Sequence, residues 1–154
     1  CFLFSSTMSS WRSPLALVQD PLYWLGVPIA LLFGGSGRLH LVQPYPYVTM
    51  MRGMPLAAWH PAIVTISGWI ELGFAGALLV QPSASVVLWT RYLTLAITPA
   101  NINMWYNNAP FGDVYFTPKQ HALRGVAQVV LLTWLWGLEK AYSSREVSMR
   151  LKND

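Results

Sequence analysis

Glu71 is the residue of this sequence that most clearly asks for a chemical explanation. It lies inside an otherwise apolar run from Ala62 to Val80. A carboxylate within a membrane-spanning segment is costly unless it is paired, hydrogen-bonded or protonated. Gly68 and Ala75 share its face of the expected helix, and such small residues let a second helix approach closely. Glu71 is therefore either a polar contact that holds helices together or part of a working site.

Polar side chains recur at helical spacing in the other apolar segments as well. Because polar groups within a membrane are best satisfied by one another, the pattern predicts that these stripes face a common interior. One hypothesis is a polar pocket that opens toward the 43–60 loop. The other is an ion pair of Glu71 with Arg38 or Arg124 that only pins the helices. In either case the expected buried network consists of Arg38, His40, Glu71, Asn101, Asn103, Arg124 and Gln128.

The composition is that of a membrane protein. Of 154 residues, 54% are hydrophobic and 10% are charged, whereas soluble domains carry about 25% charged residues. Eight Trp and seven Tyr suit the interface between lipid and water. The basic residues are scattered along an apolar chain, which argues against nucleic acid as a partner. The net charge of +4 fits anionic lipid head groups instead.

Four apolar segments are each long enough to cross a bilayer, which takes about 20 residues. They cover residues 22–42, 61–80, 85–106 and 119–142. We therefore expect an all-α integral membrane protein, a four-helix bundle that runs up-down-up-down with both termini on the same side. The expected organisation is an N-terminal tail at 1–20, the transmembrane domain at 21–142 and a polar C-terminal tail at 143–154.

The side that holds the termini carries more Lys and Arg than the other side. The positive-inside rule then places the termini in the cytoplasm or the mitochondrial matrix. Met8 precedes a short stretch with Ser and Arg and no acidic residue, which fits either the remnant of an organellar targeting segment or the true start of a short N-terminal tail. Cationic side chains on this side are expected to bind phospholipid head groups, cardiolipin among them. These are Arg12, Arg91, Lys140 and Arg145.

The sequence predicts no catalytic residue, no metal site and no covalently bound cofactor. His40, His60 and His121 lack the i, i+4 partner or the nearby carboxylates of a metal site. A haem between His40 and His121 is the less favoured alternative. There is no glycine-rich phosphate loop and no cysteine pattern for an iron–sulfur cluster.

Several short motifs resemble those of the DoxX-like family of small four-helix membrane proteins. The resemblance spans about residues 21–140. It implies four transmembrane helices, and the last motif lacks the proline that is usual in the family. The motifs are Gly37-Arg38-Leu39-His40, Ser67-Gly68-Trp69-Ile70-Glu71, Leu78-Leu79-Val80-Gln81-Pro82, Pro99-Ala100-Asn101-Ile102-Asn103-Met104 and Arg124-Gly125-Val126-Ala127-Gln128.

Two functions remain open. The first is a non-catalytic accessory subunit of an energy-transducing complex, a respiratory-chain complex or ATP synthase, in the mitochondrial inner membrane. Its partners would be other membrane subunits and phospholipids. The second, implied by the resemblance, is a quinone-linked component of an oxidoreductase. In that function Glu71 would exchange a proton, Arg124 and Asn101 would hold a quinone carbonyl, and Trp105 would stack on the ring. A small-solute transporter is a third alternative, which the absence of an internal repeat disfavours.

Overall fold

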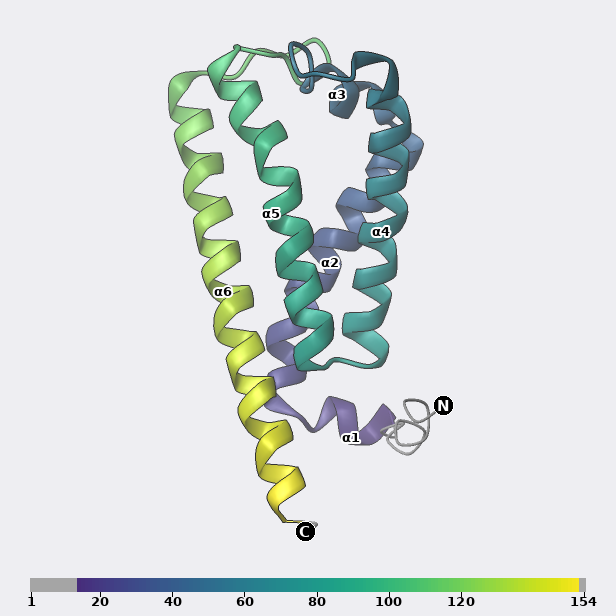
Figure 1. Ribbon diagram of the computed structural model, residues 1–154, viewed down its shortest axis with the longest axis vertical. Coiled ribbons are helices and arrows are strands. Elements are labelled where there is room, and N and C mark those ends of the chain that lie inside the picture. Colours follow the sequence, from purple (N-terminus) through teal and green to yellow (C-terminus); the bar gives the residue numbers. More distant parts are fainter. Residues whose placement is uncertain (1–13, 153–154) are drawn as a thin grey trace.

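A computed structural model describes residues 14–152. The regular secondary structure of these residues is helical, and one isolated bridge joins Phe111 to Val114. Four long helices run side by side (Figure 1). The α3 helix and the connections from α2 to α4 and from α5 to α6 lie at one end, and α1, the α4–α5 turn and the last turns of α6 lie at the other. The helices are α1 (Pro14–Val18), α2 (Pro21–Val42), α3 (Pro44–Thr49), the 3₁₀ helix η1 (Ala57–Trp59), α4 (His60–Val80), α5 (Ala84–Tyr106) and α6 (Pro118–Leu151).

The long helices associate as two pairs, because α2 packs mainly on α4 and α5 packs mainly on α6. Near the termini the two pairs share one apolar core, in which Phe33 of α2, Leu78 of α4 and Leu135 of α6 are fully buried. A second, smaller core lies at the opposite end. It consists of Met50, Met51, Val64 and Met104, with aromatic residues of the loops around it.

Local sequence signals explain where the long helices begin. Asp20 caps α2 by accepting a hydrogen bond of 3.1 Å from the Leu22 backbone N–H, and Pro21 occupies the first turn. Ser83 caps α5 in the same way. Thr117 and Gln120 form a reciprocal capping box at the start of α6. These caps place the helix starts within two residues of the starts expected from the apolar segments.

The α6 helix continues to Leu151, so most of the residues expected as a polar C-terminal tail, 143–154, are helical. The physical reason lies in two contacts that the extension makes. Arg145 pairs with Asp20 at the start of α2. The Glu146 carboxylate accepts a hydrogen bond of 3.0 Å from the Ala84 backbone N–H at the start of α5. The last turns of α6 therefore hold the beginnings of two neighbouring helices.

Two segments are long and apolar enough to cross a membrane by length and composition, Pro21–Val42 and Ala57–Val80. Over the described residues α5 and α6 do not meet the same measure. The polar residues along both helices lower their hydropathy, and these residues pair with one another between the two helices, as described below.

Candidate functional site

The site begins where α2 and α4 cross at two glycines. A Cβ atom on Gly37 would stand 2.7 Å from the Gly68 carbonyl oxygen, and one on Gly68 would stand 2.7 Å from the His40 Cβ. Real Cβ atoms essentially never come this close to another heavy atom. Only glycine permits this crossing, and the crossing brings His40 next to Glu71.

Glu71 is buried beside this crossing, with 1% of its surface exposed. Its Oε1 atom is 3.4 Å from the His40 Nδ1 atom, which is longer than a good hydrogen bond. The Ser36 hydroxyl also approaches the carboxylate, without hydrogen-bond geometry to either oxygen. Among residues 14–152, neither carboxylate oxygen accepts a hydrogen bond. A fully buried acidic group is thus left without a donor of its own.

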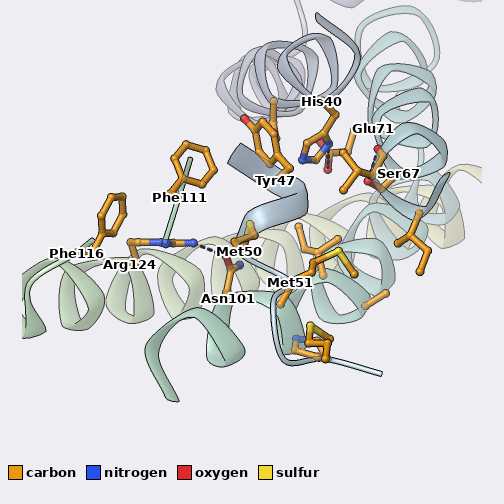
Figure 2. A pocket seen from close by; sticks show the side chains of 18 residues that line it. His40, Tyr47, Met50, Met51, Ser67, Glu71, Asn101, Phe111, Phe116 and Arg124 are labelled. Carbon is orange, nitrogen blue, oxygen red and sulfur yellow. Dashed lines mark hydrogen bonds and ion pairs between the residues drawn. The ribbon is translucent and has the colours of Figure 1, made fainter. Parts of the chain in front are cut away.

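Tyr47 of α3 covers the His40–Glu71 pair from the loop side (Figure 2). Its ring meets the His40 ring edge to face, with 3.8 Å between the centroids, and the Phe111 ring follows at 5.1 Å. Burial raises the pKa of the Tyr47 phenol. The phenol therefore stays protonated at neutral pH and keeps a hydrogen to donate.

A second polar group joins α5 to α6. The Arg124 guanidinium donates to the Asn101 side-chain oxygen at 2.6 Å and also contacts the Met104 sulfur. Gln128 accepts a hydrogen bond from the Asn101 amide at 3.3 Å and donates to the Thr98 hydroxyl at 3.0 Å. The polar stripes of these two helices thus satisfy one another, which is what their spacing predicts.

Between the two polar groups lies a cavity of about 620 Å³. His40 and Glu71 belong to one wall and Arg124 with Asn101 to the other (Figure 2). Three of its lining residues, Ile63 on α4 and Ala96 and Pro99 on α5, are exposed, and α4 packs less closely on α5 than on α2. We infer from this that the cavity opens between α4 and α5. Most of the lining is apolar: Met50, Met51, Met54, Ile63, Val64, Ala96, Ile97, Pro99, Ala100, Phe111 and Phe116.

Buried hydrogen bonds hold the loops that close the cavity at the α3 end. The Asn103 amide donates to the Met50 carbonyl at 2.9 Å and to the Arg52 carbonyl at 3.0 Å. The Thr49 hydroxyl accepts a hydrogen bond of 2.8 Å from the Gly112 backbone N–H. These bonds connect the segment after α3 to α5 and to the loop that carries Phe111 and Phe116. The aromatic wall of the cavity is therefore tied to the helices.

Two sequence-based expectations about this site are wrong. Arg38 does not belong to the buried network, because it lies on the exposed face of α2, about half a helical turn away from His40. Glu71 accordingly faces His40 rather than Arg38 or Arg124. Trp105 does not line the cavity, since its ring stacks on His121 at a centroid distance of 5.9 Å on the exposed side of α5.

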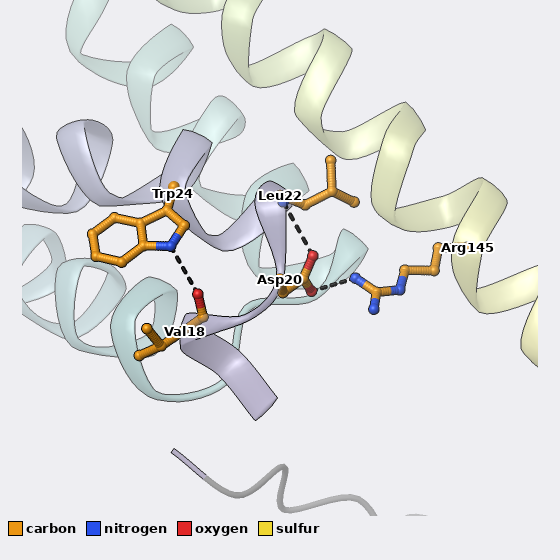
Figure 3. A network of polar contacts seen from close by, with 5 residues as sticks. All are labelled: Val18, Asp20, Leu22, Trp24 and Arg145. Atoms are coloured by element: carbon orange, nitrogen blue, oxygen red, sulfur yellow. Dashed lines mark hydrogen bonds and ion pairs between the residues drawn. The ribbon is translucent and has the colours of Figure 1, made fainter. Parts of the chain in front are cut away.

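The four cationic residues that were expected to bind lipid head groups lie in different surroundings. Arg12 lies outside the described residues. Lys140 is exposed. Arg91 pairs with Glu139 of α6 at 2.9 Å, and Arg145 pairs with Asp20 at the start of α2 (Figure 3). The two paired arginines therefore hold helices together, and their binding to lipid stays a prediction.

Sequence reasoning missed the residues of the cavity that come from the connections between the long helices. Tyr47 and the methionines at 50, 51 and 54 follow the first long helix, and Phe111 and Phe116 precede the last. The available signal was the concentration of methionine and aromatic residues in otherwise polar, proline-containing connections. Such residues are unusual in a solvated loop and indicate a packed one. Within residues 14–152 no group of three or more His, Cys, Asp or Glu side chains is placed to hold a metal ion.

Fold and site together define an all-helical protein with an internal, mostly apolar cavity that has one acidic and one basic wall. Residues 29–139 match the family described as Domain of unknown function (DUF8561), and the chain belongs to this family. The matched segment contains every residue that lines the cavity. No curated protein and no solved structure matches the chain. The resemblance to the DoxX-like family stays a prediction.

Proposed function

We propose that this chain is an integral membrane protein that binds a small, largely apolar molecule with a polar head group. In this proposal the four long helices cross the bilayer as an up-down-up-down bundle, with both termini on one side. The binding site is the cavity of about 620 Å³, a size within the range of about 300–1,000 Å³ that is typical of small-molecule sites.

The outer faces of the helices support a membrane environment. Large apolar side chains point outward on all four, for example Leu31 of α2, Ile66 of α4 and Val129 of α6, which are 66%, 58% and 63% exposed. Leu95 of α5 is exposed as well. In water such faces are unfavourable, because each Å² of apolar surface covered gains roughly 25 cal/mol. Acyl chains remove this penalty.

The observation that carries the proposal is the position of the cavity relative to these faces. Its opening lies between Ile63 of α4 and Ala96 and Pro99 of α5, which face the surroundings of the bundle. In a bilayer this opening faces lipid. An apolar molecule can then enter from the acyl chains and bring its head group to the buried polar walls, without crossing water.

A quinone is the ligand class that the resemblance to the DoxX-like family implies. Arg124 and Asn101 would donate hydrogen bonds to one carbonyl, and a protonated Glu71 would donate to the other. Reduction of the quinone to the quinol takes two electrons and two protons. The electrons would come from a flavin or metal centre of a partner subunit, and Glu71 would pass one of the protons.

The second candidate is the accessory subunit of a respiratory-chain complex or ATP synthase in the mitochondrial inner membrane. The exposed tryptophans favour it, since Trp is enriched where proteins contact one another. Trp24, Trp69, Trp89 and Trp136 are all more than half exposed, and they lie on four different helices. This function predicts copurification at fixed stoichiometry from native membranes. A chain that is isolated alone and monodisperse in mild detergent would contradict it.

Filling the cavity tests the binding function directly. Ala100 lines the cavity, so Ala100→Phe should occupy space that the ligand needs. We expect it to weaken binding of any short-chain amphiphile, whether quinone, alcohol or amine, by about tenfold or more, which corresponds to ~1.4 kcal/mol. The measurement is quenching of tryptophan fluorescence by titration in a neutral detergent.

The matched control is Ala127→Phe, which adds the same ring to the exposed face of α6 and should leave binding unchanged. Size-exclusion chromatography of both variants reports whether each is folded and monodisperse. If the unmodified chain binds none of the amphiphiles saturably, or if Ala100→Phe binds them as the unmodified chain does, the proposed site is wrong.

A further inference from the structure

The proposed function does not name the polar head group of the ligand. The buried carboxylate of Glu71 limits which head groups can bind. The side chain lines the cavity and is 1% exposed, and neither of its oxygens accepts a hydrogen bond from residues 14–152. An ionised carboxylate only accepts hydrogen bonds. Leaving such a group buried without a donor is among the costliest arrangements in a protein. Unless it is protonated, the carboxylate therefore needs a donor or a positive charge that a ligand would supply.

The cations nearest to the cavity do not supply that charge. Arg38 points away from the cavity on the exposed face of α2. Arg124 is on the opposite wall, where Asn101 binds it at 2.6 Å and the Phe116 ring lies 5.2 Å from its guanidinium carbon. His40 is 3.4 Å from the carboxylate, but its Nδ1 atom makes no hydrogen bond to either oxygen.

The surroundings of Glu71 suit an ammonium group. The Ser67 hydroxyl donates its hydrogen to the Val64 carbonyl at 2.9 Å, so its oxygen is left to accept a hydrogen bond on the cavity side. Ser36 adds a second hydroxyl to the same wall. The Tyr47 ring lies over this wall, and aromatic rings attract cations. An ammonium would find a negative charge, hydroxyl oxygens and an aromatic ring together.

We infer that this cavity binds a cationic amphiphile, a protonated amine joined to an apolar body, with the ammonium on Glu71. This inference rests on the proposed function and deepens it. The apolar body lies among the methionines at 50, 51 and 54, whose flexible side chains adapt to irregular shapes. A carboxylate or phosphate head group is repelled by Glu71. A carbonyl or quinone head group, which also only accepts hydrogen bonds, binds there only when Glu71 is protonated.

Three ligands of equal chain length separate these cases: decylamine, decanol and decanoate. They are titrated against the full chain in a neutral maltoside detergent, with tryptophan fluorescence as the readout. We expect saturable binding of decylamine at least tenfold tighter than that of decanol or of decanoate, whose carboxylate is repelled by Glu71. Glu71→Gln should remove the preference for the amine, so that decylamine and decanol bind about equally, whereas Glu71→Asp, which keeps the carboxylate, should retain it.

Glu139→Gln is the matched control, because it removes a carboxylate that pairs with Arg91 and does not line the cavity. The preference for the amine should persist in this variant. If decanol binds as tightly as decylamine to the unmodified chain, or if Glu71→Gln folds and keeps the preference, the inference is wrong while the binding function stands. If none of the ligands binds, both are wrong. If Glu71→Gln does not fold, the binding of decylamine and decanol to the unmodified chain and to Glu71→Asp decides whether the inference holds. A preference for decylamine in both supports it, and its absence from either contradicts it.

Discussion

Replacement of Gly68 by alanine tests whether the crossing of α2 and α4 creates the site. The new Cβ would stand 2.7 Å from the His40 Cβ and 3.0 Å from the Gly37 carbonyl oxygen, whereas ordinary contacts of a Cβ fall at 3.4–4 Å. Both obstructing atoms belong to, or are attached directly to, the backbone of α2. A side-chain rotation cannot relieve the clash, so the two helices must separate.

The size of the effect follows from two opposing contributions. Overpacking of this kind costs roughly 1–3 kcal/mol. Alanine in place of glycine inside a helix gains up to about 1 kcal/mol. Gly73 lies on the same helix, and a Cβ atom there would have nothing within 4 Å. Gly73→Ala therefore gains the helix propensity of alanine without any overpacking. The difference in unfolding free energy between the two variants therefore isolates the clash, and we expect Gly68→Ala to be less stable than Gly73→Ala by about 1–3 kcal/mol.

The assay is unfolding in detergent micelles, followed by helical circular dichroism as temperature or sodium dodecyl sulfate rises. Separation of α2 from α4 should also move His40 away from Glu71, so ligand binding should weaken in Gly68→Ala and stay normal in Gly73→Ala. Equal stability and equal binding of the two variants would refute the reasoning, because the helices would then not depend on close approach at this glycine.

Two further substitutions test contacts at opposite ends of the protein. Thr49→Val should destabilise the fold by about 1–3 kcal/mol in thermal unfolding, because it leaves the buried Gly112 N–H without its acceptor. The control is Thr65→Val, on an exposed face of α4, which should be near neutral. Equal effects of the two substitutions would contradict the role of the Thr49–Gly112 bond. Asp20→Ala should cost at least about 0.5–2 kcal/mol, because it removes the cap on Leu22 together with the charge that Arg145 of α6 contacts. Asp20→Asn removes the charge but keeps a capping oxygen, so it should be less destabilising. An asparagine variant as unstable as the alanine variant would show that charge, not capping, holds the start of α2.

The positions of the long helices could be predicted from the sequence because their signals are local. An apolar run, a capping residue such as Asp20 and a first-turn proline act within a few residues of one another, so the starts of α2 and α6 follow from short stretches of chain. The end of α6 could not be predicted in the same way. Its last turns are polar, and contacts with α2 and α5, far away in sequence, keep them helical.

The polar residues of the site were identified in the sequence by their presence in apolar runs, but their partners were not. Periodicity gives the face on which a residue lies only within its own helix. Arg38 and His40 are two positions apart and therefore point in different directions, and nothing local decides which of them turns inward. The close approach at Gly37 and Gly68 decides it, because only the His40 side can come so near to α4.

The sequence by itself determined that the chain is helical, that its helices have apolar faces, and that one acidic residue needs a partner. Composition and spacing are enough for this, because both can be read along the chain. The tertiary structure alone decided that this residue, Glu71, borders a cavity, that the cavity opens between α4 and α5, and that residues between the long helices, such as Tyr47 of α3, complete it. A cavity is the space that packed helices leave unfilled. It depends on how closely each pair of helices can approach, and that distance is a property of two surfaces together.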